Sequence, residues 1–349
     1  MRLLRFAICL CVYAMAFPQI AAAGTTTIYV PADEQTIQQA IDVAVNGDEI
    51  VVSPGTYNES IDLLGKAITV RSEMGAPATT IDASGLNTAA VVFQSGETTS
   101  TILEGFTLTG GIGVQVGSER RGGAIWMMMS DPTIRRCVFT GNTADDGGAM
   151  YGSISDPSIL NCLFYDNSAT EGGAVATNLG TPILKNCTFT QNSAATGSQI
   201  HSTQGTTRLI NCIVWDTDPD LLAGTANYVI TYSDIRGGWP GAGNIDANPQ
   251  FVDASSNNFR LKTTSPCVDA GDSSAISAEI FTDIDNNQRG INEPSVTDTG
   301  IPIFGLTVDM GAYELQASAN EQCPHDINQD QQIDVTDLLD LLARWGECE

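Results

Sequence analysis

The sequence predicts an all-β solenoid, a parallel β-helix, on two observations. The first is a repeat of 25 residues that runs without insertion through the middle of the chain. A fixed period of roughly 20 to 50 residues is the signature of a repeat architecture. The second is the content of each period, in which short β-branched and aromatic runs alternate with Gly, Asn, Asp and Pro. Such runs form strands, and the residues between them form turns.

Several residue types mark the repeat at the same step. The matching positions are Cys137, Cys162, Cys187 and Cys212; Gly-Gly-Ala at 122–124, 147–149 and 172–174; Phe139, Phe164 and Phe189; Asn142, Asn167 and Asn192; and Asn161, Asn186 and Asn211. A period of this length accommodates three short strands and three turns, which make one rung, and successive rungs stack at ~4.8 Å. We therefore expect inner columns of Cys and Phe, and a turn column of Asn whose amides bond along the stack.

The cysteine column is expected to hold free thiols. Side chains stacked in register point the same way, whereas a disulfide needs converging Cβ vectors. A buried free Cys behaves as a small hydrophobe. These four residues are therefore predicted to fill the core.

A solenoid must close its open apolar ends. Over residues 36–45, the spacing of Ile37, Ile41, Ala44 and Val45 predicts a short helix with one apolar face that plugs the first rung. Towards the other end the strict repeat dissolves, so less regular rungs and a terminal cap are expected. The expected divisions are a signal peptide at 1–23, the solenoid at 24–265, irregular rungs and a cap at 266–316, and a C-terminal module at 317–349.

The N-terminus has the pattern of an export signal. Arg2 and Arg5 precede an apolar run from Phe6 to Ala16, and the small residues at 21–23 suit a signal peptidase. The run is too short to span a bilayer, and no membrane span is expected elsewhere. We therefore expect a secreted protein, extracellular or held in the periplasm or at the cell surface.

The charge balance restricts the partners. With 15 Lys+Arg against 41 Asp+Glu, the formal net charge is −26. Nucleic acid binding requires a basic surface, so we expect no nucleic acid partner, and docking on anionic lipid is disfavoured for the same reason. The expected partner is a glycan or cell-surface polymer, bound by a monomer.

The C-terminal tail has the spacing of a calcium loop. Oxygen-bearing side chains occupy loop positions 1, 3, 5, 9 and 12, and position 7 supplies a backbone carbonyl. In that order with position 7 included, the candidate ligands are Asp326, Asn328, Asp330, Gln332, Asp334 and Asp337. The alternative is an acidic amphipathic helix without metal. Cys323 and Cys348 bracket this small exported unit and are expected to form a disulfide staple, with Cys267 free.

These motifs resemble known families. The Gly-Gly-Ala and Phe-x-x-Asn pairs resemble the repeats of polymorphic outer-membrane proteins and related right-handed β-helix proteins of the pectate-lyase-like superfamily. The resemblance spans residues 28–315 and implies a right-handed coil. The tail resembles one dockerin-type calcium repeat, which implies Ca²⁺ binding and the possibility of docking to a protein receptor.

A cluster of arginines suggests one place for chemistry. One and two periods beyond Arg121 come Asp146 and Glu171. An arginine patch beside carboxylates on a β-helix resembles polyuronate lyases, in which Ca²⁺ acidifies the sugar α-proton and Arg removes it. The alternative, which we favour, is an ion pair between Arg121 and Asp146 on neighbouring rungs, contributing about 0–1 kcal/mol. The clustered arginines are Arg120, Arg121, Arg135 and Arg136, and the catalytic candidates are Arg121, Arg136, Asp146 and Glu171.

Other candidate positions have simpler explanations. Asp131 and Asp156 fall one period apart, each before a proline, and are interpreted as a repeated turn rather than as a carboxylate pair. The tryptophans at 126, 215 and 239 are either sugar platforms or parts of the core or cap. No Ser-His-Asp arrangement is indicated.

The sequence supports two hypotheses about function. The first is a secreted β-helix protein that binds glycan or cell-surface material without catalysis and carries a calcium-binding tail. The alternative is a polysaccharide lyase or glycoside hydrolase that acts on a face of the solenoid. The absence of a convincing catalytic set favours the first.

Overall fold

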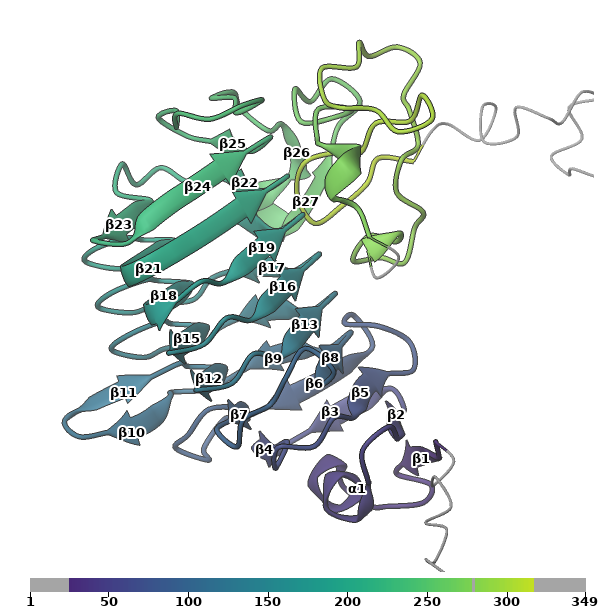
Figure 1. The fold of residues 1–349 in the computed structure, drawn as a ribbon, viewed down its shortest axis with the longest axis vertical. Coiled ribbons are helices and arrows are strands. Elements are labelled where there is room, and N and C mark those ends of the chain that lie inside the picture. Colours follow the sequence, from purple (N-terminus) through teal and green to yellow (C-terminus); the bar gives the residue numbers. More distant parts are fainter. Residues whose placement is uncertain (1–24, 278–279, 317–349) are drawn as a thin grey trace, which may run out of the picture.

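The computed structural model describes residues 25–277 and 280–316, which form a coil of short strands (Figure 1). Three strands per turn build three parallel sheets, here named A, B and C. Sheet A contains β1 (Thr27–Val30), β2 (Glu49–Val52), β5 (Thr69–Ser72), β8 (Ile102–Glu104), β13 (Thr133–Arg135), β16 (Ser158–Leu160), β19 (Ile183–Lys185), β21 (Ile200–Ile210) and β24 (Asn227–Thr231). Sheet B contains β3 (Gly55–Tyr57), β6 (Thr79–Asp82), β9 (Thr107–Thr109), β14 (Val138–Thr140), β17 (Leu163–Tyr165), β20 (Thr188–Phe189), β22 (Ile213–Val214) and β25 (Asp234–Ile235). Sheet C contains β4 (Ile61–Asp62), β7 (Val91–Phe93), β12 (Ile125–Met128), β15 (Met150–Ser153), β18 (Val175–Gly180), the first half of β21, and β23 (Leu222–Gly224).

Residues that are 25 positions apart in the sequence are paired in neighbouring strands of the sheets. Ile125 pairs with Met150, Met150 with Val175, and Val175 with Ile200, in parallel. The predicted all-β parallel β-helix is confirmed. In the last regular turn the corner between sheets C and A straightens, so the single long strand β21 belongs to both sheets.

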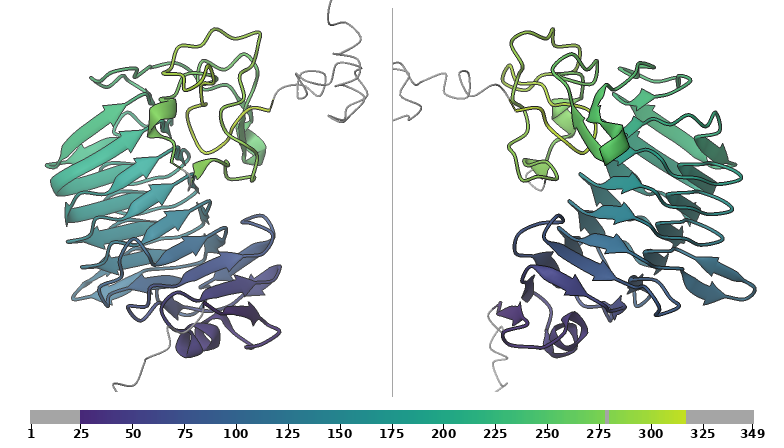
Figure 2. Two further views of the ribbon diagram at one scale, coloured as in Figure 1. Left: turned by 45° about the vertical axis from the view of Figure 1, so that its right-hand side comes forward. Right: turned by 180° about the vertical axis from the view of Figure 1, so that it is seen from behind.

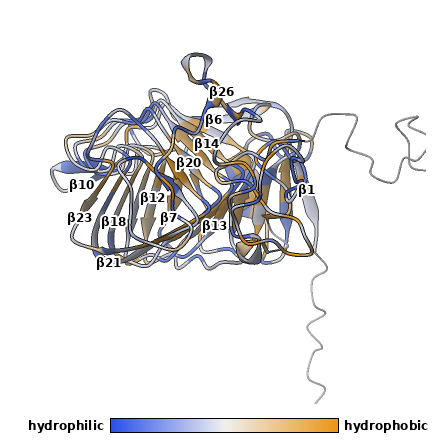
Figure 3. Ribbon diagram, turned by 90° about the horizontal axis from the view of Figure 1, so that it is seen from above, coloured by the Kyte–Doolittle hydropathy of each residue, from blue (hydrophilic) through white to orange (hydrophobic). Residues whose placement is uncertain are grey.

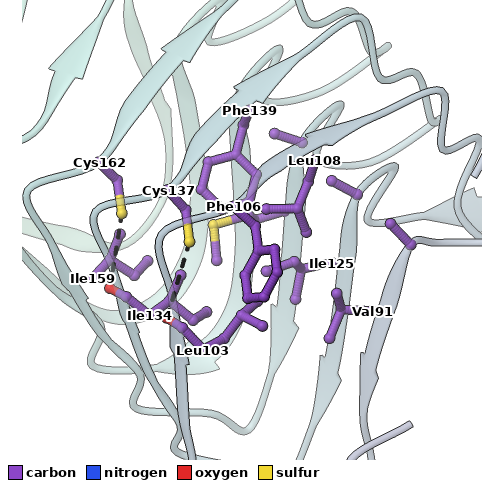
Figure 4. Close-up of a cluster of buried hydrophobic side chains, with 14 of the residues drawn as sticks. Val91, Leu103, Phe106, Leu108, Ile125, Ile134, Cys137, Phe139, Ile159 and Cys162 are labelled. Atoms are coloured by element: carbon purple, nitrogen blue, oxygen red, sulfur yellow. Dashed lines mark hydrogen bonds between the residues drawn. The ribbon is translucent and has the colours of Figure 1, made fainter. Parts of the chain in front are cut away.

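The predicted inner columns are also confirmed. The four repeat cysteines are buried and free, and the sulfurs of Cys137 and Cys162 point the same way into the core (Figure 4). Phe139 stacks on Phe164 and Phe164 on Phe189, with ring centroids 4.5 and 4.6 Å apart and planes within 6° of parallel. Hydrophobic residues gather inside the coil when it is viewed from above (Figure 3).

One asparagine column forms the expected amide ladder. The Oδ1 atom of Asn167 accepts hydrogen bonds from the backbone N and Nδ2 of Asn142, at 3.2 and 3.0 Å. Asn192 accepts the same pair of bonds from Asn167, at 3.0 and 2.9 Å. These side chains are buried, so the ladder satisfies backbone groups that the turns would otherwise leave without partners.

The Gly-Gly-Ala motif has a steric cause. The first glycine of each motif has a positive φ, for example 68° at Gly147, a conformation that disfavours side chains. At the second position, a Cβ added to Gly148 would lie 2.2 Å from the carbonyl oxygen of Gly173 on the next rung. The rungs therefore approach too closely for a side chain at Gly123, Gly148 and Gly173, whereas the equivalent position in the next rung is Ser198.

The N-terminal end is covered by helix α1 (Ile37–Val43). Thr36 caps it by accepting a hydrogen bond from the backbone N of Gln39. Ile37, Ile41 and Ala44 are buried as predicted, but Val45 is 50% exposed. The expectation for Val45 was wrong because the helix ends at Val43 and the chain turns away from the core.

A hairpin of β10 (Val114–Val116) and β11 (Glu119–Arg121) interrupts the coil before the first strict repeat. It projects beside β12 at the edge of sheet C (Figure 1). Val114 and Val116 pack against the buried cluster of Ala89, Trp126, Tyr151 and Ala176, so the hairpin covers part of the outer face of that sheet.

The C-terminal segment adds no further rungs but lies along the side of the solenoid (Figure 2). This differs from the irregular rungs expected over residues 266–316. Its elements are β26 (Phe251–Asp253), the 3₁₀ turn η1 (Ala254–Ser256), β27 (Asn258–Leu261) and the 3₁₀ turn η2 (Ser273–Ala275).

The second asparagine column explains this docking. Asn161 accepts a hydrogen bond from Arg289, Asn186 donates one to the carbonyl oxygen of Asp309, and Asn211 accepts one from the backbone N of Asp272. These asparagines have positive φ values of 50–55°, which turn their side chains outward. A repeated residue that stabilises a corner of the coil thus also binds the C-terminal segment.

No helix within residues 25–277 and 280–316 is long and apolar enough to cross a membrane. The expected signal peptide, the six calcium ligands and the Cys323–Cys348 disulfide lie outside the described residues.

Candidate functional site

The four clustered arginines separate into two places. Arg135 and Arg136 both pair with Glu104 at the corner between sheets A and B. Arg136 also donates a 2.7 Å hydrogen bond to the hydroxyl of Thr282, which fastens the C-terminal segment. Arg136 therefore does not join Arg121 and has a structural role.

Arg121 does meet the two predicted carboxylates. Arg121, Asp146 and Glu171 follow one another in parallel bridges at one corner of successive rungs, beside sheet C. The Nε atom of Arg121 lies 3.0 Å from Oδ2 of Asp146, and its NH2 atom lies 2.5 Å from Oε2 of Glu119 on the hairpin. The predicted inter-rung ion pair is confirmed, and Glu119 adds a second carboxylate to the same guanidinium.

The outer face of sheet C forms the floor beside this corner. Trp126, Tyr151, Ala176 and His201 occupy one outward row on β12, β15, β18 and β21, each paired with the next. Strand neighbours lie ~4.8 Å apart, so Tyr151 and His201 stand about twice that distance apart on either side of the small Ala176. Ala176, the smallest residue of this row, is 3% exposed, so the neighbouring side chains cover it.

A depression of about 250 Å³, here named the Ala176 hollow, lies beside this row. Its charged corner is formed by Arg121, Asp146 and Glu171, and Asn178 lies on the opposite side. The lining residues are Glu119, Arg121, Asp146, Tyr151, Glu171, Ala176, Thr177, Asn178, His201 and Thr203.

The charges of the hollow influence one another. Burial raises the pKa of Asp146 above its ordinary value although Arg121 opposes the shift, and Glu119 and Glu171 raise it further. Burial disfavours the charged form of Arg121, but the hydrogen bond to Glu119 and the neighbouring acidic groups raise its pKa overall. Its guanidinium also lies 5.1 Å from the ring centre of Tyr151, whose pKa burial raises. Arg121 is therefore held firmly as a cation.

His201 is a site residue that the sequence analysis missed. Its Nδ1 atom lies 3.1 Å from Oε2 of Glu171, and its side chain is 13% exposed. The signal was available, because positions 126, 151, 176 and 201 are separated by the same step as the cysteines. Glu119 had no such signal, since it belongs to the inserted hairpin.

The remaining candidates are structural. The Oδ1 atom of Asp131 accepts a hydrogen bond from the backbone N of Asp156, and Asp156 accepts one from Thr181 in the same way, which confirms the repeated turn. Trp126 is buried beneath the hairpin, so it offers no sugar platform. Within the described ranges, no group of three or more His, Cys, Asp or Glu side chains is arranged to hold a metal ion.

The comparison with protein-family models agrees with this architecture. Residues 73–242 match the family model described as a right handed beta helix region. The chain is an all-β, right-handed parallel β-helix. A solved structure of pectate lyase Pel9A is similar over 84% of this chain and 97% of that chain, with 13% sequence identity and a TM-score of 0.34. A search of curated proteins finds no match.

Proposed function

We propose that this protein binds a neutral polysaccharide at the Ala176 hollow and does not cleave it. The observation that carries the proposal is the hollow itself: a depression of about 250 Å³, lined mostly by polar and charged side chains, beside the row of Tyr151, Ala176 and His201. Hydrogen-bonding side chains line the hollow, as a sugar with many hydroxyl groups requires. Because the rungs repeat along the sheet, a polymer can continue beyond the hollow across neighbouring strands.

The charge of the hollow supports a neutral ligand. Three carboxylates, those of Glu119, Asp146 and Glu171, line it beside the single guanidinium of Arg121. A polyuronate would bring further negative charge to this place, in a chain that already carries −26. Unfavourable juxtaposition of like charges is a common basis of selectivity.

The state of Arg121 argues against a lyase. An arginine that removes the sugar α-proton must first lose its own, and the ordinary arginine pKa already exceeds about 12. The neighbouring Glu119 and Asp146 raise the pKa of Arg121 further, so this guanidinium is a poor base. It is better suited to donating hydrogen bonds to sugar oxygens.

The test fills the hollow without changing a charge. The full chain is titrated calorimetrically with neutral oligosaccharides such as cello-, manno- and galacto-oligomers, and the best ligand is then titrated into Ala176→Trp. The expected result is saturable binding that weakens at least tenfold, or about 1.4 kcal/mol. The matched control is Met128→Trp, which adds the same side chain at an exposed position on the same face. Equal affinity for the wild type and Ala176→Trp would refute the proposal.

A glycoside hydrolase is the second candidate. Asp146 and Glu171 occupy neighbouring rungs, and the spacing of ~4.8 Å between rungs is close to the ~5–5.5 Å between carboxyl groups in retaining glycosidases. The raised pKa of Asp146 suits a general acid. New reducing ends that Asp146→Asn and Glu171→Gln both abolish would establish hydrolysis. Unsaturated ends released from a polyuronate would instead establish a lyase.

The export signal and the calcium tail belong to the same proposal. An exported glycan-binding protein would use the tail, through Asp326 and its companions, for Ca²⁺-dependent stability or docking. Titration of the full chain with Ca²⁺ should give heat that Asp326→Ala greatly reduces. Identical isotherms for the two proteins would remove the metal from the proposal.

A further inference from the structure

A second depression lies where β20, β22 and β25 of sheet B end, facing β26 and Lys262, the residue after β27. We name it the Trp215 cleft; its volume is about 400 Å³. The lining residues that matter here are Gln191, Trp215, Arg236, Gln250, Phe251 and Lys262.

The cleft is built by the same geometry as the Ala176 hollow. Tyr165, Thr190, Trp215 and Arg236 occupy successive positions at the ends of β17, β20, β22 and β25, linked by the inter-rung backbone hydrogen bonds. Thr190 is the small member of this row, and the half-buried Trp215 follows it. Phe251 approaches from β26 and gives the cleft a second aromatic wall.

The charge of this cleft is unusual for the molecule. Within the described residues, neither Arg236 nor Lys262 has a carboxylate within ion-pairing distance, and both side chains are exposed. The arginines that do form ion pairs are Arg71, Arg121, Arg135, Arg136, Arg260 and Arg289. Two cations without an ion-pair partner therefore line this cleft together with one acidic residue, Asp216, in a chain with 41 acidic residues.

Neighbouring groups position these cations rather than neutralise them. The NH1 atom of Arg236 donates to the carbonyl oxygen of Asp216. Its guanidinium lies 5.9 Å from the ring centre of Trp215. The carboxylate of Asp216 accepts hydrogen bonds from the side chain of Gln199 and the backbone N of Thr217. The guanidinium therefore retains donors for a ligand.

We propose that the Trp215 cleft binds an acidic saccharide, with a uronate carboxylate between Arg236 and Lys262 and the sugar ring against Trp215. A guanidinium recognises a carboxylate through two parallel hydrogen bonds, and an indole offers a flat apolar surface to the C–H face of a sugar. The amides of Gln191 and Gln250 supply further hydrogen bonds to hydroxyl groups. This site is independent of the Ala176 hollow and has the opposite charge preference.

The test uses a pair of ligands that differ in the carboxylates. Calorimetry of the full chain with tri-mannuronate is compared with mannotriose, at about 20 and 300 mM salt. Both ligands are titrated into the Ala176→Trp variant, in which the first site is closed. Tri-mannuronate is expected to bind saturably and at least tenfold more tightly than mannotriose. Its affinity should be lower at high salt. Lys262→Gln, at an exposed position, and Arg236→Gln should each weaken binding several-fold.

Two controls keep the result specific. Arg208→Gln removes an exposed charge outside the cleft and should leave the affinity unchanged. Binding should also quench tryptophan fluorescence in the wild type and much less in Trp215→Phe. The proposal is overturned if tri-mannuronate fails to bind at millimolar concentration, if mannotriose binds equally well, or if Arg208→Gln has the same effect as Lys262→Gln.

Discussion

Replacement of Asn167 by alanine should destabilise the solenoid strongly. The Nδ2 atom of Asn167 donates to the carbonyl oxygen of Phe139 at 2.9 Å, to that of Tyr165 at 3.0 Å and to Oδ1 of Asn192 at 2.9 Å. Its Oδ1 atom accepts from the backbone N and Nδ2 of Asn142. The substitution removes the two bonds that Oδ1 accepts and the three contacts that the two Nδ2 hydrogens share, all in a buried turn.

The magnitude follows from the groups left without partners. The backbone N of Asn142 loses its partner inside the protein, and a buried unsatisfied group costs about 1–3 kcal/mol. The Oδ1 atom of Asn192 keeps the bond from the backbone N of residue 167. With the other lost bonds at up to about 1 kcal/mol in total, we expect the free energy of unfolding to fall by about 2–4 kcal/mol. Urea denaturation monitored by tryptophan fluorescence measures it. The control is Asn178→Ala on the outer face of sheet C, where one 3.3 Å side-chain bond is lost and less than about 1 kcal/mol is expected. A loss below about 1 kcal/mol at Asn167 would refute the ladder as a source of stability.

Three further outcomes are expected. Gly148→Ala should lower the free energy of unfolding by about 3 kcal/mol in urea denaturation, because the added Cβ meets the next rung; wild-type stability would contradict this explanation of the glycine motif. The four repeat thiols should resist a thiol reagent in the native protein and react after unfolding, since burial raises the pKa of Cys137 and Cys187 and encloses all four; rapid native labelling would contradict the core assignment. Burial raises the pKa of Asp234 from 3.8 to about 7, so the folded state holds a proton that the unfolded state releases. Stability from this group should be present below about pH 4 and be lost as the pH rises to about 7, and Asp234→Asn should flatten that part of a thermal-denaturation pH profile; an unchanged profile would contradict the shift.

The solenoid could be predicted from the sequence because its contacts repeat at a constant separation. The residues that stack on Cys137 and Phe139 are Cys162 and Phe164, which follow 25 residues later in the sequence. The same separation gives the register of the paired strands. The ion pair between Arg121 and Asp146 is one such neighbour pair. His201, which the sequence analysis missed, also lies 25 residues after the residue with which it pairs, Ala176.

What could not be predicted are contacts without a fixed separation. Arg136 and Thr282 lie 146 residues apart, and no repeat relates them. Grouping Arg136 with Arg121 relied on closeness along the chain, whereas a rung turns a corner between them and sends their side chains to different faces. The hairpin that supplies Glu119 is likewise an insertion, and its valines pack against a buried cluster on the outer face of sheet C that contains Trp126.

The most direct test of the functional account is diffraction from crystals soaked in the neutral oligosaccharide that binds most tightly. The account predicts sugar density over Ala176, between the side chains of Tyr151 and His201, with oxygens near Arg121. Density found only at another surface, with the Ala176 hollow occupied by solvent, would contradict it.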